Sequence, residues 1–109
     1  MKNILFICSQ NRLRSPTAEQ VFCDTPGFEV ASAGTNHSAD VQLSVELVEW
    51  ADVLFVMENT HKTIVQKKYR QYLNGKRVQC LDIPDDFTYM DPNLVVLLKN
   101  KLGEFFGRQ

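Results

Sequence analysis

The stretch Ile4-Leu5-Phe6-Ile7-Cys8 is a run of apolar residues without polar alternation. Such a run is typical of a central parallel strand that is covered on both faces, so we predict a strand over Lys2 to Cys8. The following residues, Ser9-Gln10-Asn11-Arg12-Leu13-Arg14-Ser15, lead into Pro16, and proline is favoured at the first position of a helix. The sequence therefore places a thiol where a strand ends and a loop leads into a helix.

The loop that begins at Cys8 has the composition of a binding site for a tetrahedral oxyanion. Five residues separate Cys8 from Arg14, which is enough for a tight loop whose backbone N–H groups point inward. The guanidinium of Arg14 can bind two oxygens of the same anion. A helix N-terminus stabilises both a bound phosphate and a cysteine thiolate. One loop thus supplies a nucleophile and an anion site.

Further apolar stretches alternate with helical patterns along the rest of the chain. We predict strands over 28–33, 52–57 and 77–81. We predict helices from 16 to the break at Thr25-Pro26-Gly27 and over 40–50, 58–72 and 92–106. Ser15 is the predicted N-cap of the first helix. This alternation predicts right-handed βαβ units, and hence an α/β fold with a four-stranded parallel sheet and helices on both faces. Ligands bind at the carboxyl ends of such strands, which is where Cys8 lies.

Length and charge limit the possible functions. A chain of 109 residues predicts a single domain over 1–109. The net charge of −1 predicts no general attraction to nucleic acid. The first apolar run is too short to span a bilayer and has no cleavage-site pattern after it. We therefore expect a cytoplasmic protein that binds neither nucleic acid nor membrane, and its oligomeric state is left open.

The cysteines are Cys8, Cys23 and Cys80. They have neither the spacing of metal ligands nor the even number of a secreted disulfide framework. We therefore expect no metal, no cofactor and no structural disulfide. Cys23 and Cys80 are predicted to be core or near-core thiols, whereas Cys8 is available as a nucleophile.

Four sequence blocks resemble the low-molecular-weight protein tyrosine phosphatases. The stretch from Cys8 to Glu19, CSQNRLRSPTAE, resembles the family's phosphate loop. Ser32-Ala33-Gly34-Thr35, Ala51 to Met57 and Asp82-Ile83-Pro84-Asp85-Asp86-Phe87 resemble, in the family's order, the motif after its second strand, its third strand and its acidic loop. The resemblance implies the flavodoxin-like strand order 2-1-3-4. It also implies a metal-independent phosphomonoester hydrolase, a protein tyrosine phosphatase, that forms a phosphocysteine intermediate.

The chain departs from the family pattern at several positions. Leu13 stands where many members have a second cysteine, so a disulfide cannot form within the loop. Asp86 replaces the proline that usually follows the catalytic aspartate, and the aromatic pair after it is reduced to Phe87. The tract after Thr35 is shortened, so part of the usual active-site rim is expected to be missing.

The resemblance implies roles for three catalytic residues. Cys8 would attack phosphorus as a thiolate, and Arg14 would hold two equatorial phosphoryl oxygens. Asp85 would protonate the leaving oxygen and later activate water. Asp82 and Asp86 remain alternatives for this acid.

Other residues are expected to bind or support the phosphoryl group. The substrate-binding loop comprises Ser9, Gln10, Asn11, Arg12, Leu13, Arg14 and Ser15. Ser15 would donate its hydroxyl to the sulfur, while Asn11 and Ser32 would support the shape of the loop. His37 is a candidate for bracing the loop and Phe87 for flanking the pocket. His61 and the basic residues Lys62, Lys67, Lys68 and Arg70 are assigned to a solvated helix face.

Two other functions fit parts of the pattern. Arsenate reductases use a similar anion cradle, but their chemistry requires resolving thiols, and only Cys80 lies beside the acidic loop. A shortened domain that kept Arg14 and lost turnover would instead be a binding module for phosphorylated ligands. The expected ligand in the leading hypothesis is a phosphorylated protein or a small phosphomonoester.

Overall fold

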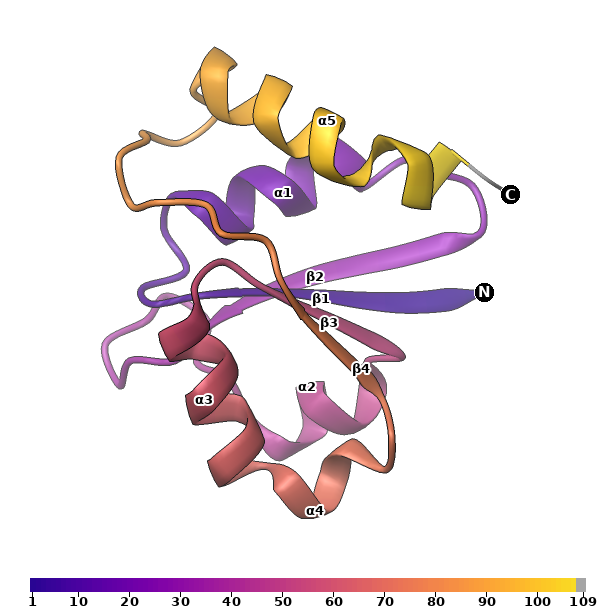
Figure 1. Ribbon diagram of the computed structural model, residues 1–109, viewed down its shortest axis with the longest axis vertical. Coiled ribbons are helices and arrows are strands. Elements are labelled where there is room, and N and C mark those ends of the chain that lie inside the picture. Colours follow the sequence, from indigo (N-terminus) through magenta and orange to yellow (C-terminus); the bar gives the residue numbers. More distant parts are fainter. Residues whose placement is uncertain (108–109) are drawn as a thin grey trace.

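The computed structural model describes residues 1–107 and has a parallel sheet at its centre (Figure 1). The strands are β1 (Lys2–Cys8), β2 (Phe28–Gly34), β3 (Val53–Val56) and β4 (Arg77–Cys80). They pair in the order β2-β1-β3-β4, and each pair is parallel. The predicted fold class and strand order are therefore confirmed.

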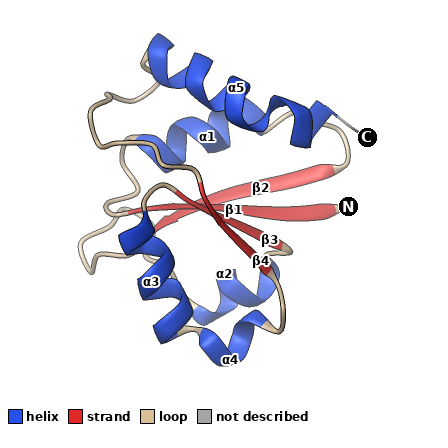
Figure 2. Ribbon diagram, in the orientation of Figure 1, coloured by secondary structure: helices blue, strands red, loops and turns tan. Residues whose placement is uncertain are grey.

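Helices cover both faces of the sheet (Figure 2). One face carries α1 (Arg14–Phe22) and α5 (Pro92–Gly107), and the other carries α2 (Val45–Trp50), α3 (Asn59–Lys68) and α4 (Arg70–Leu73). Among residues 1–107, no helix combines the length and the apolar character that crossing a bilayer requires.

Two hydrophobic clusters lie on opposite sides of β1. Ile4 and Phe6 belong to the cluster beneath α1 and α5, while Leu5 and Ile7 belong to the cluster that also contains residues of α2 and α3. All four side chains are fully buried. Burial on both faces explains why β1 has no polar alternation, and it fixes the point at which Cys8 leaves the sheet.

The first helix begins earlier than predicted. It starts at Arg14 with Leu13 as its N-cap, and no side chain caps it. The prediction that Ser15 caps this helix is therefore wrong. Ser15 is buried in the first turn, where its Oγ lies 2.9 Å from the Sγ of Cys8. The hydroxyl contacts the sulfur instead of the helix terminus.

The helices on the second face are shorter than predicted. The helix expected over 40–50 begins only at Val45, because the Oγ of Ser44 accepts a hydrogen bond from the N–H of Leu47 and caps it there. The helix expected over 58–72 is divided into α3 and α4 at Tyr69, whose ψ of 20° is not helical. The phenol of Tyr69 donates to the carbonyl of Leu43, which ties this break to the segment before α2.

Candidate active site

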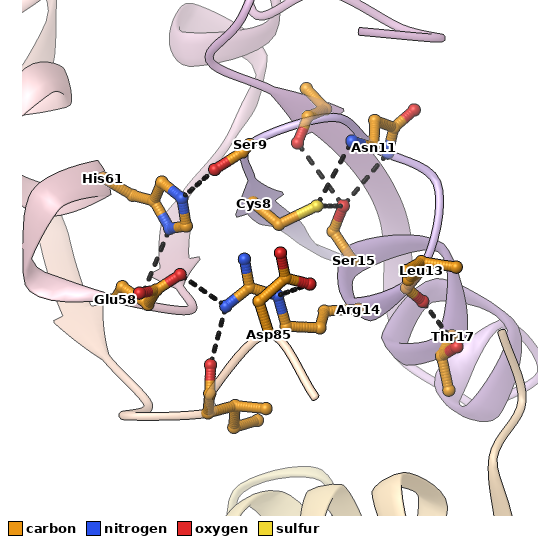
Figure 3. Close-up of polar contacts among 12 residues, drawn as sticks. Cys8, Ser9, Asn11, Leu13, Arg14, Ser15, Thr17, Glu58, His61 and Asp85 are labelled. Atoms are coloured by element: carbon orange, nitrogen blue, oxygen red, sulfur yellow. Dashed lines mark hydrogen bonds and ion pairs between the residues drawn. The ribbon is translucent and has the colours of Figure 1, made fainter. Parts of the chain in front are cut away.

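The loop after β1 folds back around the sulfur of Cys8 (Figure 3). Cys8 is 3% exposed, and its Sγ receives a hydrogen bond from the backbone N–H of Asn11 at 3.3 Å. Asn11 has a φ of 56°, in the left-handed region that asparagine tolerates better than most residues. The turn at Asn11 therefore brings a main-chain donor and the hydroxyl of Ser15 onto the same sulfur.

The side chain of Asn11 connects the loop to β2. Its Nδ2 donates to the Oγ of Ser15 at 3.1 Å and to the Oγ of Ser32 at 2.8 Å. Ser32 in turn donates to the Oε1 of Glu19 at 2.5 Å. The Oγ of Ser15 accepts from Asn11, so its own proton is directed either to the sulfur of Cys8 at 2.9 Å or to the carbonyl of Ala33 at 3.4 Å. The structure thus brings together the residues that the sequence assigned to supporting the loop.

Arg14 is buried beside the sulfur, with 2% of its side chain exposed. Its Nη1 donates to the Oε2 of Glu58 and to the carbonyl oxygen of Ile83, both at 2.7 Å. Its Nε lies 3.7 Å from the Oδ1 of Asp85. The other terminal nitrogen points toward the side of the pocket where Cys8 lies (Figure 3). The guanidinium is therefore held in place through Nη1, and its other terminal nitrogen is available to bind an anion in the pocket.

A pocket of about 220 Å³ opens in front of this sulfur. Its lining comes from the loop and one residue of the acidic segment, namely Cys8, Ser9, Gln10, Arg12, Leu13, Arg14 and Asp85. Within residues 1–107, the backbone N–H groups of Ser9, Gln10, Arg12 and Leu13 have no hydrogen-bond acceptor. Unpaired N–H groups beside a guanidinium are suited to binding the oxygens of a phosphate.

Gly34, at the end of β2, allows the loop to lie against the sheet. A Cβ at this position would lie 2.5 Å from the carbonyl oxygen of Ser9 and 3.0 Å from the backbone nitrogen of Asn11. The next two residues, Thr35 and Asn36, donate their N–H groups to the carbonyls of Cys8 and Ser9, each at 3.0 Å. The close approach therefore requires a residue without a side chain.

The structure distinguishes the three carboxylates that the sequence proposed as the acid. Asp85 lines the pocket, and 64% of its side chain is exposed. Asp82 instead accepts a hydrogen bond from the thiol of Cys80 at 3.4 Å. Asp86 is exposed and is not among the residues that line the pocket. Of these three, Asp85 is the carboxylate that meets Arg14 and the pocket.

Two candidates lie away from the positions expected for them. His37 is exposed, and its ring pairs with the amide of Gln42 at 3.3 Å instead of bracing the phosphate loop. Phe87 is partly buried and packs against the hydrophobic cluster beneath α1 and α5, so it does not flank the pocket. The ring packs against the hydrophobic core. The polar residues around Phe87 in the sequence did not indicate this position.

Sequence reasoning missed His61, which it assigned to a solvated surface. His61 is 2% exposed, and its Nε2 lies 2.8 Å from the Oγ of Ser9. Its Nδ1 accepts the backbone N–H of Glu58, while the Glu58 carboxylate accepts the backbone N–H of His61 in a capping box. Burial, and then the positive charge of Arg14, lower the pKa of His61. The sequence did contain one signal for this position. Glu58 precedes His61 by three residues directly after β3, the spacing of a capping box at a helix start.

The other two cysteines are not among the residues that line the pocket. Cys23 is exposed, and its thiol donates to the carbonyl of Gln20, so the prediction of a core position is wrong. Cys80 is partly buried, and burial raises the pKa of its thiol, with the carboxylate of Asp82 adding to the effect. No second thiol lines the pocket within the described part of the chain. Residues 1–107 also contain no group of three acidic, histidine or cysteine side chains placed to hold a metal ion.

No protein-family model and no curated protein sequence matches this chain. Several solved structures have its fold. The YwlE arginine phosphatase from Geobacillus stearothermophilus has 22% identity and a TM-score of 0.78, over 98% of this chain and 94% of that chain. The tyrosine phosphatase Wzb from Escherichia coli K30, in complex with phosphate, has 20% identity and a TM-score of 0.79, over 98% and 97%.

A third similar structure is SP-PTP, a low molecular weight protein tyrosine phosphatase from Streptococcus pyogenes. It has 16% identity and a TM-score of 0.81, over 99% of this chain and 93% of that chain. These similarities extend over nearly the whole of the chain described above. The fold of this chain is therefore that of the low molecular weight protein tyrosine phosphatases.

Proposed function

We propose that this chain is a metal-independent phosphomonoester hydrolase, a protein tyrosine phosphatase that acts through a phosphocysteine intermediate. The observation that carries the proposal is the meeting of Cys8, Arg14 and Asp85 at one pocket. A nucleophile, an anion clamp and an exposed carboxylate are the groups that phosphoryl transfer to a cysteine requires. The substrate is a phosphorylated protein or a small phosphomonoester.

In the first step the thiolate of Cys8 attacks phosphorus. A sulfur–phosphorus bond forms as the bond from phosphorus to the leaving oxygen breaks, and Asp85 gives its proton to that oxygen. The hydroxyl of Ser15 and the N–H of Asn11 already bond the sulfur and stabilise its negative charge. Asp85, on the open side of the pocket, is placed to reach the leaving group.

In the second step water replaces the sulfur. Asp85, now a carboxylate, accepts a proton from the attacking water as the sulfur–phosphorus bond breaks. Cys8 leaves as a thiolate, again stabilised by Ser15 and Asn11. The products are inorganic phosphate and the original enzyme, with Asp85 protonated for the next cycle.

Arg14 is suited to binding the phosphoryl group in both steps. Its planar fork matches charge that spreads over equatorial oxygens, which a lysine ammonium cannot match. The contacts to Glu58 and to the Ile83 carbonyl hold one edge of the fork in place before substrate binds. This preorganisation favours electrostatic stabilisation of the transition state.

The two alternative functions have less support. Resolving an arsenate adduct needs a second thiol, whereas Cys23 and Cys80 lie outside the pocket lining. A module that only binds phosphorylated ligands has no need of a carboxylate at the pocket mouth, and Asp85 is there. Both observations favour hydrolysis.

The test is turnover of p-nitrophenyl phosphate in the presence of EDTA. We expect hydrolysis by the unaltered chain, loss of it by on the order of 10⁴-fold or more in Cys8→Ser, and no change in the matched control Cys23→Ser. Undiminished turnover in Cys8→Ser would contradict the mechanism. Because similar folds are described both as tyrosine and as arginine phosphatases, peptides carrying phosphotyrosine or phosphoarginine should be compared. Preferential cleavage of phosphoarginine would contradict the proposed substrate.

A further inference from the structure

The two hydrogen bonds of the His61 ring, to the backbone N–H of Glu58 and to the Oγ of Ser9, indicate which atoms of His61 and Ser9 carry a proton. The Nδ1 of His61 receives the backbone N–H of Glu58 at 3.1 Å, and a backbone N–H can only donate. This nitrogen must therefore be unprotonated. In a neutral ring the proton is then on Nε2, which lies 2.8 Å from the Oγ of Ser9 and donates to it.

The neutral form of His61 agrees with its surroundings. The ring is buried between the loop and the start of α3, and its charged neighbours are Arg14, Glu58 and Asp85. Burial and the Arg14 guanidinium lower the pKa of His61 against the opposing influence of the two carboxylates. The ring is therefore neutral near pH 7.

The hydroxyl of Ser9 then has a proton to give. Its oxygen accepts from His61, and within residues 1–107 its hydrogen has no acceptor in the protein. Ser9 also lines the pocket together with Cys8 and Arg14. A hydroxyl whose oxygen is held by one donor, on a residue that lines the pocket, keeps its hydrogen free to donate to an anion bound there.

We propose that Ser9 donates its hydroxyl hydrogen to a bound phosphoryl oxygen, and that His61 is the positioning residue that holds Ser9 in this role. The inference deepens the proposed function, and it rests on the pocket being the oxyanion site used there. It adds a side-chain donor to the main-chain N–H groups of the loop. It also gives the buried histidine a purpose beyond capping α3.

Two substitutions separate the two contacts of His61. In His61→Asn, the side-chain oxygen can take the place of Nδ1 and keep the helix cap, but the side chain is too short to reach Ser9. In His61→Gln, the side-chain amide can take the place of Nε2 and donate to Ser9. A role limited to the cap predicts that Asn is the better replacement, whereas the proposed role predicts that Gln is.

The experiment is calorimetric titration of the chain with inorganic phosphate at pH 7. We expect Ser9→Ala and His61→Asn each to weaken phosphate binding by about ten- to a hundredfold, the range for a hydrogen bond to a charged group. His61→Gln should remain within about threefold of the unaltered chain. The double variant Ser9→Ala/His61→Asn should be no weaker than Ser9→Ala alone, because His61 acts through Ser9.

Controls separate this effect from a general loss of stability. Ser44→Ala removes the cap of α2, away from the pocket, and should lower the urea midpoint of unfolding while leaving phosphate affinity unchanged. Urea unfolding of every variant identifies any that fails to fold, and Ser9→Ala then tests the proposal without altering the buried ring.

Several results would overturn the inference. The first is an unchanged phosphate affinity in Ser9→Ala, and the second is a loss of phosphate affinity in the double variant equal to the sum of the two single losses. The third is a higher phosphate affinity in His61→Asn than in His61→Gln. The fourth is no measurable phosphate binding by the unaltered chain. The readout is binding and not turnover. A chain that shows the expected pattern but does not hydrolyse p-nitrophenyl phosphate would therefore contradict the proposed function and leave the role of Ser9 and His61 intact.

Discussion

The phosphate loop, residues 9–15, and the acidic loop, residues 81–91, both reach the pocket but are held very differently. In the first, Asn11 and Ser15 are buried, and a hydrogen bond joins their side chains to each other. The second is tied to the sheet where Leu81 and Ile83 donate to main-chain carbonyls of residues 56 and 57. After that the chain is exposed from 84 to 86, and its polar contact in this stretch is the ion pair between Asp85 and Arg14.

This difference separates binding from proton transfer. In the proposed function, the nucleophile and the anion site are preorganised before a ligand arrives, which lowers the free-energy cost of binding a phosphoryl group. The carboxylate of Asp85 lies on an exposed segment and contacts the guanidinium of Arg14, which we propose also binds the substrate. Changes in the phosphate loop should therefore impair both binding and turnover, whereas changes in the acidic loop should impair turnover alone.

Among the substitutions that compare the two loops, Arg14→Lys is expected to have the largest effect. It keeps a charge but loses the planar fork, so we expect turnover of p-nitrophenyl phosphate to fall by about 10³- to 10⁵-fold, with a clear loss of phosphate affinity. The matched control is Arg12→Lys at the exposed rim, where a small change is expected. Similar losses of turnover in Arg14→Lys and Arg12→Lys would contradict the prediction that the buried guanidinium of Arg14 matters more than the exposed one of Arg12.

Asp85→Asn tests the acidic loop. We expect turnover to fall by about 10²- to 10⁴-fold through loss of the general acid. Phosphate affinity should stay the same or increase, because the substitution removes a negative charge beside the anion. Kinetics and calorimetry on the same preparation measure both quantities. Asp86→Asn is the control. If turnover falls in Asp86→Asn and not in Asp85→Asn, Asp86 is the general acid instead of Asp85.

Gly34→Ala should deform the phosphate loop from the side of β2. The added methyl group would meet the carbonyl of Ser9 and the side chain of Ala39, so we expect the free energy of unfolding to fall by about 1–3 kcal/mol. Urea unfolding measures it. Gly103→Ala in α5 is the control, because within residues 1–107 its new methyl group would have no atom within 4 Å other than those of its chain neighbours and of the nearby helix backbone, and the helix should become slightly more stable. Equal stability of the two variants would show that the loop can move away from β2.

The smallest expected effect is a pH dependence of stability that originates at His61. Its pKa is lowered in the folded chain, so below the ordinary value of 6.5 the unfolded chain binds more protons. Stability should therefore fall as the pH decreases from 6.5 through the folded pKa and level off below it. Urea unfolding between pH 5 and 7.5 should show this slope in the unaltered chain and in His37→Gln, but less of it in His61→Gln. Identical slopes in all three would contradict the assignment.

The strands and the catalytic loop could be predicted because their signals are local. The apolar run ending at Cys8 and the short spacing to Arg14 define a strand and a loop without reference to the rest of the chain. The parallel sheet then follows from the order of the elements. The structure places Cys8, Arg14 and Asp85 at one pocket, as the resemblance implied.

The missed features depend on contacts between distant residues. His61 is buried because β3 lies beside β1, which places the start of α3 against Ser9, 52 positions earlier in the chain. The break at Tyr69 involves the carbonyl of Leu43, 26 positions earlier. Phe87 packs against a cluster that combines the nearby Ile83 with distant residues such as Phe6. For His61 the one local signal was Glu58, three positions earlier, whereas the residues next to Tyr69 and Phe87 did not distinguish them from ordinary surface residues.

The placement of the cysteines also determines how the pocket responds to peroxide. Oxidation of a thiolate gives a sulfenic acid, which a neighbouring thiol can capture as a disulfide before it is oxidised further. Leu13 occupies the loop beside Cys8, and the Cys23 and Cys80 thiols are engaged elsewhere. Within residues 1–107, a sulfenic acid at Cys8 would therefore have no thiol in the pocket lining with which to form a disulfide, and its reduction would require a thiol from solution.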